Sequence, residues 1–146
     1  MVMNMKSSKE MLSSILKTTQ MGQIGIRTVL DTTMKPGLRK ALESQLREYD
    51  KIESEAHAIA GQRGWEVKEL DPAVRFMSNM MTRMTLGRNN HDSKIAGMMI
   101  QGNTRGMILV LKNTRRCDAP DEQIAELAQK LLVTQKHNIE SMEPFV

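Results

Sequence analysis

The chain is 146 residues long, and its 40% hydrophobic and 26% charged residues are the composition of a single globular domain with a buried core. Aromatic residues make up only 3%, whereas methionine occurs 14 times, so aliphatic and thioether side chains have to build that core. This composition favours helices over an all-β fold. One cysteine excludes an internal disulfide bond, and the first residues lack the apolar run of a signal peptide, so we expect a cytoplasmic protein. No stretch approaches the roughly 18 apolar residues of a membrane span, so we expect no stable membrane insertion.

Apolar residues recur at helical spacing through the first half of the chain. Between Ser7 and about Thr32 they are separated by three, four or seven positions, which predicts an amphipathic helix over residues 7–32. Pro36 interrupts the pattern, and a second long periodic segment predicts a helix over residues 36–63. The outer face of this helix carries charges at spacings of four, as a solvated surface does: Arg39, Glu43, Arg47, Lys51 and Glu55.

Three further helices are predicted in the second half. A shorter connector helix covers residues 71–86. Asp92 is a candidate N-cap for a helix over residues 92–115, which has apolar residues on several sides, so we expect it to be the most buried helix. The segment Asp118-Ala-Pro-Asp is a favourable start for the last helix, over residues 119–143.

Loop lengths predict how these helices are connected. Short loops join the first helix to the second and the fourth to the fifth, so each pair should form an antiparallel hairpin. Residues 64–91 are long enough to run back along helices of about 25 residues, which span about 37 Å. We therefore predict an all-α fold, a ferritin-like four-helix bundle with an extra connector helix between the second and third bundle helices. A plain up-and-down bundle with a lid helix is the alternative.

Three segments carry a resemblance to a known family. They are Lys17-Thr-Thr-Gln-Met-Gly, Ile95-Ala-Gly-Met-Met-Ile-Gln-Gly-Asn-Thr-Arg-Gly-Met and Leu131-Leu-Val-Thr-Gln-Lys-His-Asn-Ile-Glu. Almost the whole chain resembles small bacterial ferritin-like four-helix proteins, most of which are described as domains of unknown function. The shared motifs are packing motifs, so the resemblance implies the fold and no particular activity.

A ferritin-like di-metal site would need inward carboxylates from all four bundle helices, because two hard cations require bridging carboxylates. The first helix has acids only near its ends, Glu10 and Asp31. In the second helix Glu53 lies near the apolar face, and His57 follows four residues later. This pair is a candidate surface metal site, although an ion pair at the edge of the core is the simpler interpretation.

In the last helix, amides stand where a metal-binding relative would have Glu-x-x-His. Gln135 lies near the middle of the apolar face and Asn138 at its edge, and neutral amides replace bridging carboxylates poorly. Gln45 falls on the core stripe of the second helix. Because buried amides need partners, we predict a core polar layer of Gln45, Gln135 and Asn138 that sets the helix register. The alternative is that one or more of them reaches water.

Glycines in helix interiors each cost roughly 1 kcal/mol relative to alanine, so another interaction should offset them. They lie in the first and fourth predicted helices: Gly22, Gly25, Gly97, Gly102 and Gly106. We predict tight packing of the fourth helix against the first across Gly102 and Gly106, so that Gly102→Leu would overpack the contact. A ligand pocket opened by the glycines is the alternative.

The connector helix carries a cluster of methionines, Met77, Met80, Met81 and Met84. Thioethers are soft ligands suited to Cu(I), so Met77 and Met81 join Glu53 and His57 as candidate metal ligands. Methionine also fills irregular apolar contacts. We therefore predict that this helix lies against the bundle or a second subunit through a stripe of Val74, Met77, Met81 and Met84.

No catalytic or nucleic-acid-binding pattern is present in the sequence. The net charge of +4 is spread over alternating signs, and four aromatic residues offer no stacking platform for bases. Cys117 follows two arginines, and we expect an ordinary thiol on the solvent side. The leading hypothesis is a non-enzymatic bundle without a cofactor, which acts by self-association, as a dimer, or by binding another partner. The alternative is a metal-binding protein that uses Glu53 and His57 or the methionines.

Overall fold

The computed structural model describes residues 7–86, 91–117 and 121–146, and its elements are helical. The sequence predicts helices in the same five places. Residue 119, where the last one was expected to start, lies outside the described residues. The elements are α1 (Ser8–Leu30), α2 (Pro36–Gln62), α3 (Pro72–Leu86), α4 (Asp92–Arg115), α5 (Glu122–Met142) and the short 3-10 helix η1 (Glu143–Phe145).

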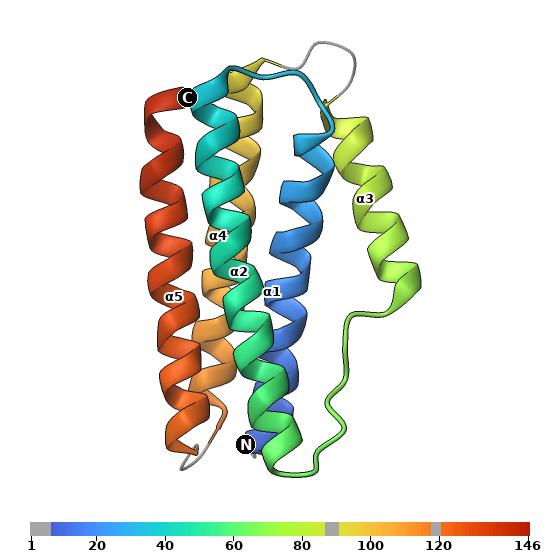
Figure 1. The fold of residues 1–146 in the computed structure, drawn as a ribbon, viewed down its shortest axis with the longest axis vertical. Coiled ribbons are helices and arrows are strands. Elements are labelled where there is room, and N and C mark those ends of the chain that lie inside the picture. Colours follow the sequence, from blue (N-terminus) through green and yellow to red (C-terminus); the bar gives the residue numbers. More distant parts are fainter. Residues whose placement is uncertain (1–6, 87–90, 118–120) are drawn as a thin grey trace, which may run out of the picture.

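Two helical hairpins, α1–α2 and α4–α5, pack side by side into a four-helix bundle (Figure 1). Within it, α1 lies against α4 and α2 lies against α5. After α2, residues 63–86 run back along the outside of the bundle, and their helix α3 packs on α1. As a result, α2 and α4 begin at the same end of the bundle, which is the geometry expected of a crossover between two hairpins. None of the described helices is long and apolar enough to cross a membrane.

Side-chain caps define where two of the bundle helices begin. Ser7 Oγ accepts from the backbone N–H of Glu10 at 3.1 Å, and the Glu10 carboxylate accepts from the N–H of Ser7 at 3.3 Å, so α1 opens with a capping box. At α5, Asp121 Oδ1 accepts from the backbone N–H of Gln123 at 3.0 Å. This cap marks the start of α5 at Glu122 within the described residues.

The predicted cap of α4 is wrong. His91 occupies the N-cap position without a side-chain hydrogen bond, and Asp92 lies in the first helical turn. There the Asp92 carboxylate accepts from the backbone N–H of Lys35, with both oxygens at 3.4 Å. Asp92 thus ties the α1–α2 loop to the N-terminus of α4, where a negative charge also interacts favourably with the helix dipole.

The expectation that α4 would be the most buried helix is also wrong. Ten residues of α1 are buried, against six of α4. The reason lies in the packing, because α1 is covered by α2, α4 and α3, whereas α4 packs chiefly against α1 and α5. The remaining side of α4 leaves its apolar residues in solvent: Ile108, Leu109 and Leu111.

Helix α3 lies on the bundle, but not through the predicted methionine stripe. Met77 is 61% exposed and Met81 is 63% exposed, while the side chain of Met84 lies outside the described residues. Polar contacts set the rotation of α3 instead. Thr28 Oγ1 of α1 donates to Asn79 Oδ1 at 2.9 Å, and Arg83 Nη2 lies 3.1 Å from Asp31 Oδ2. Met77 and Met81 therefore do not pack within this chain, and contact of the stripe with a second subunit stays a prediction.

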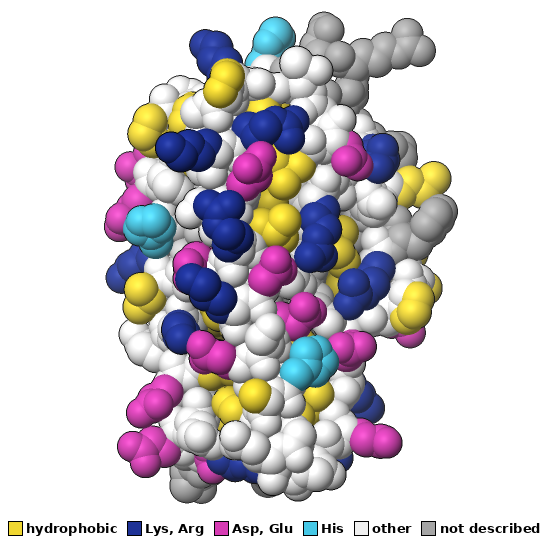
Figure 2. Space-filling view, in the orientation of Figure 1, with side chains coloured by type: hydrophobic (Ala, Val, Ile, Leu, Met, Phe, Trp, Pro, Cys, Tyr) yellow, Lys and Arg dark blue, Asp and Glu magenta, His cyan; other side chains and the backbone are white. Residues whose placement is uncertain are grey.

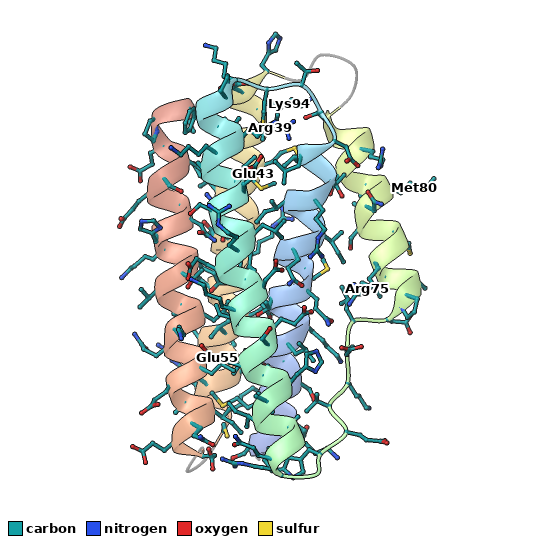
Figure 3. The ribbon with its side chains drawn as sticks, in the orientation of Figure 1. Arg39, Glu43, Glu55, Arg75, Met80 and Lys94 are labelled. Atoms are coloured by element: carbon teal, nitrogen blue, oxygen red, sulfur yellow. The ribbon has the colours of Figure 1, made fainter. Side chains whose placement is uncertain are left out.

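The charged face of α2 is largely solvated, but two of its residues contact groups outside α2. Arg39 Nη2 donates to the backbone carbonyls of Leu30 and Thr32, both at 2.9 Å. It therefore satisfies carbonyl groups at the C-terminal end of α1 that have no partner within the helix. Farther along the same face lies Glu55 (Figure 3), which pairs with Lys130 of α5.

Candidate functional site

An apolar cleft of about 460 Å³ opens between α1, α3 and α4. This volume falls within the range of about 300–1,000 Å³ that is typical of small-molecule pockets. Residues from α1 and α4 form two of its walls. The third wall comes from the residue Leu70 just before α3 and from residues of α3 at spacings of four: Val74, Ser78 and Thr82.

Glycines explain why the cleft exists. Gly25 and Gly102 line it, and a Cβ added at Gly102 would have no heavy atom within 4 Å, while one at Gly25 would reach only the Met99 methyl carbon at 4.0 Å. These two positions leave open space between the helices. The predicted tight contact across Gly102 is therefore wrong, and the alternative of a glycine-lined pocket describes this position.

Two other glycines that line the cleft are closely packed. A Cβ at Gly22 would lie 2.7 Å from Cε2 of Tyr49, so only glycine allows the Tyr49 ring to approach α1. At Gly106 a Cβ would collide with Nε2 of Gln135 and would lie 3.5 Å from Cγ2 of Thr18. Helix α4 therefore approaches α1 closely at Gly106, and the cleft widens from there toward Gly102.

A buried hydrogen-bond cluster forms the floor of the cleft. The Tyr49 hydroxyl donates to Asn103 Oδ1 at 2.8 Å, and Asn138 Nδ2 donates to the same oxygen at 3.2 Å. Asn103 Nδ2 in turn donates to the carbonyl of Met99 at 2.8 Å. Burial raises the pKa of Tyr49 to about 12, although its hydrogen bond with Asn138 acts in the opposite direction. The phenol therefore stays protonated at neutral pH.

Gln135 is the amide of greatest interest, because it lines the cleft and is incompletely bonded. Its side chain is 1% exposed, and its Oε1 has no hydrogen-bond partner within the described part of the chain. A buried acceptor without a partner costs about 1–3 kcal/mol. A residue that lines the cleft therefore carries a buried acceptor without a partner in the described part of the chain.

The predicted core polar layer is divided among separate partners. Gln45, Gln135 and Asn138 are all buried. Asn138 belongs to the cluster with Tyr49, whereas Gln45 Nε2 donates to Ser141 Oγ at 2.8 Å. The three amides, which lie on the apolar faces of two helices, thus contact different surroundings, because each meets different neighbouring groups.

Both charged side chains that line the cleft are basic. They are Lys17 of α1 and Arg105 of α4. Among the described residues of the lining there is no histidine, cysteine, aspartate or glutamate. The polar groups around the cleft are therefore amides, hydroxyls and cations, a set suited to binding.

The candidate metal ligands Glu53 and His57 contact different neighbours. Glu53 Oε2 accepts from Gln20 Nε2 at 3.2 Å, and His57 Nε2 lies 3.2 Å from Glu69 Oε1. Gln20 also accepts from the backbone N–H of Leu70 at 2.8 Å, so it ties the connector to α1. Within residues 7–86, 91–117 and 121–146, no group of three or more His, Cys, Asp or Glu side chains is placed to hold a metal ion.

Sequence reasoning missed several buried polar residues, and it misplaced one thiol. Gln20, Gln23 and Asn103 are buried, although only their positions on apolar stripes could have indicated it. Cys117, expected on the solvent side, is 7% exposed and belongs to the hydrophobic core cluster. It lies two residues after Arg115, the last residue of α4.

Comparison with known proteins identifies a related fold. No protein-family model and no curated protein matches this chain. The structure is similar to the crystal structure of a DUF305 fragment, a domain of unknown function, from Deinococcus radiodurans, with a TM-score of 0.72 and 15% sequence identity over 94% of this chain and 93% of that chain. At this identity the similarity concerns the fold alone. The chain is thus a DUF305-like helical domain in fold; the name of the matched protein does not confirm the ferritin-like label.

Proposed function

We propose that this chain is a non-enzymatic binding protein, and that the cleft between α1, α3 and α4 takes a small apolar molecule with a hydrogen-bond donor. The observation that carries the proposal is Gln135 Oε1, a buried acceptor without a described partner at the wall of an apolar cleft. A ligand N–H or O–H would remove the cost of that acceptor. The aliphatic and thioether side chains of the walls would cover the rest of the molecule.

The chemistry of the lining supports binding over catalysis. General acid–base catalysis needs a group whose pKa lies near the working pH. Tyr49 has a pKa of about 12, and the described lining has no histidine, cysteine or carboxylate. Amides and hydroxyls orient a ligand without exchanging protons with it.

A fluorescent probe tests this proposal directly. N-phenyl-1-naphthylamine is apolar and carries one N–H, so it should bind saturably to the wild-type chain with a rise in fluorescence. Gly102→Leu should abolish this binding, because the new side chain extends into the open space of the cleft. Gly97→Leu is the matched control, since Gly97 lies in the same helix, has no atom near its Cβ position and does not line the cleft. Absence of saturable binding, or equal loss in both variants, would contradict the proposal.

A second candidate function is self-association through the α3 methionine face, which we define as Met77, Met80 and Met81. Met80 is 52% exposed and projects away from α1 (Figure 3), and the other two are more exposed. Apolar side chains reach the surface along this edge of the molecule beside basic ones (Figure 2). Exposed methionines are well suited to adaptable protein contacts, and a dimer would cover them.

Light scattering after size-exclusion chromatography tests the dimer. The wild-type chain should show twice the mass of one chain, and the double variant Met77→Ser, Met81→Ser should show the mass of one chain. The thermal midpoint of the separated chain should barely change, because neither side chain contributes to the core of one subunit. A wild-type mass of one chain at every concentration would exclude self-association through this face.

The same exposed thioethers support Cu(I) binding as the alternative. Thioethers that are not engaged in a core are free to coordinate a soft cation. An anaerobic competition titration against a chromogenic Cu(I) chelator should then show binding that the double serine variant loses and Glu53→Ala retains. We also infer that the bundle is ferritin-like in its connectivity, which the crossover between α2 and α4 supports.

A further inference from the structure

We propose that the cleft selects a small organic anion, with an apolar body and an acidic group held between Lys17 and Arg105. This inference rests on the proposed function, because it names the class of molecule that the cleft binds. It is carried by the position of the two basic residues, the charge of the surrounding helices and the place of the unpartnered amide oxygen.

The two basic residues lie at the same level on opposite walls. Helices α1 and α4 lie side by side and run in opposite directions (Figure 1). Thr18 meets Gly106 across this contact, with 3.5 Å between Thr18 Cγ2 and the Cβ position of Gly106. Lys17 and Arg105 are the immediate neighbours of these two residues, and both line the cleft. They are therefore placed to approach one ligand group from two sides.

The polar and apolar ends of the cleft are distinct. Nε2 of Gln135 lies close to the Cβ position of Gly106, so this side chain, whose Oε1 has no partner among the described residues, shares the end where Lys17 and Arg105 lie. Toward the other end, Gly25 faces the methyl carbon of Met99, and the space next to Gly102 is unfilled. An amphipathic molecule fits this arrangement, with its acidic group between Lys17 and Arg105, a hydrogen-bond donor at Gln135 and its apolar body toward Gly102. A free inorganic anion would leave the apolar part empty.

The helices around the cleft carry a strong excess of positive charge. In α1, α3 and α4 together, nine residues are lysine or arginine, and the acidic ones are Glu10 and Asp92, each in the first turn of its helix. Arg27 and Arg83 have acidic partners, in Asp50 and Asp31. Clefts lined by one sign of charge concentrate ligands of the other sign. The arginine fork is also suited to two parallel hydrogen bonds with a carboxylate or sulfonate.

A matched pair of probes separates the anion from the apolar body. 8-Anilinonaphthalene-1-sulfonate has the rings and the N–H of N-phenyl-1-naphthylamine and adds one sulfonate. We expect it to bind roughly tenfold more tightly at low salt, as one charge-assisted hydrogen bond would provide. In the single variants Lys17→Gln and Arg105→Gln, the affinity of the sulfonate probe should fall to that of N-phenyl-1-naphthylamine. The affinity of N-phenyl-1-naphthylamine itself should stay unchanged in both variants. Lys112→Gln, which removes a basic residue of α4 that does not line the cleft, should leave both affinities as they are.

The outcomes distinguish this inference from the function on which it rests. If neither probe binds saturably, both are wrong. If both probes bind with equal affinity, or if Lys17→Gln and Arg105→Gln weaken both equally, the apolar cleft stands and the anion preference is wrong. The sulfonate probe also binds exposed apolar surfaces, so the double variant Met77→Ser, Met81→Ser serves as a control for binding to the α3 methionine face. Loss of binding in that variant, with Arg105→Gln unaffected, would place the probe on the α3 methionine face and overturn the inference.

Discussion

The open space at Gly102 leads to a prediction with a definite sign. Glycine in a helix interior costs about 1 kcal/mol relative to alanine. At Gly102 the Cβ of alanine would have no heavy atom within 4 Å, so no clash offsets the gain. Gly102→Ala should therefore raise the free energy of unfolding by about 1 kcal/mol and the thermal midpoint by roughly 2–4 °C. Gly102→Leu should also be no less stable than wild type, whereas tight packing at this position would make it destabilising by about 1–3 kcal/mol.

Denaturant unfolding followed by far-ultraviolet circular dichroism measures this change, with the thermal midpoint as a second readout. Gly97→Ala provides the control, because its Cβ would also meet nothing within 4 Å but would lie outside the cleft. Both alanine variants should gain stability by similar amounts. The reasoning fails if Gly102→Ala loses stability while Gly97→Ala gains it, since the helices would then be closed around position 102.

Three further predictions concern the floor of the cleft. Gly22→Ala places a Cβ 2.7 Å from the Tyr49 ring and should lower the free energy of unfolding by about 1–3 kcal/mol; equal stability would show that the ring moves freely. Tyr49 is the only tyrosine, so its near-ultraviolet phenolate absorbance should titrate near pH 12 in the folded chain and near 10 in denaturant. Because the pKa of Tyr49 is higher in the folded chain, the free energy of unfolding should fall as the pH rises from 10 toward 12, and this effect should be absent below pH 10. Tyr49→Phe should remove this loss of stability. A folded pKa at the ordinary value would contradict the burial of the phenol. Asn103→Leu removes the acceptor shared by Tyr49 and Asn138 and should cost about 1–3 kcal/mol in denaturant unfolding, whereas Gln101→Leu on the exposed face should cost little; equal effects would argue against the cluster.

Local patterns in the sequence determined the helices and the residues that face inward. A helix repeats its faces every 3.6 residues, so the spacing of apolar residues identifies a helix without knowledge of its neighbours. The same reasoning put Gln45, Gln135 and Asn138 on apolar faces, and the structure buries all three. Loop lengths predicted the two hairpins and the long connection between them, because a short loop allows only an antiparallel neighbour.

Only the tertiary structure decided what each of these residues meets. Gly22 and Gly102 look alike in sequence, yet one is pressed against the Tyr49 ring and the other borders empty space. The difference depends on side chains brought by other helices, which no local pattern contains. Likewise, the apolar stripe of α3 suggested which side would face the bundle, but the bond of Thr28 with Asn79 and the ion pair of Arg83 set another rotation. The exposed α3 methionine face and the cleft are thus products of packing between distant segments, whereas the helices that carry them follow from the sequence alone.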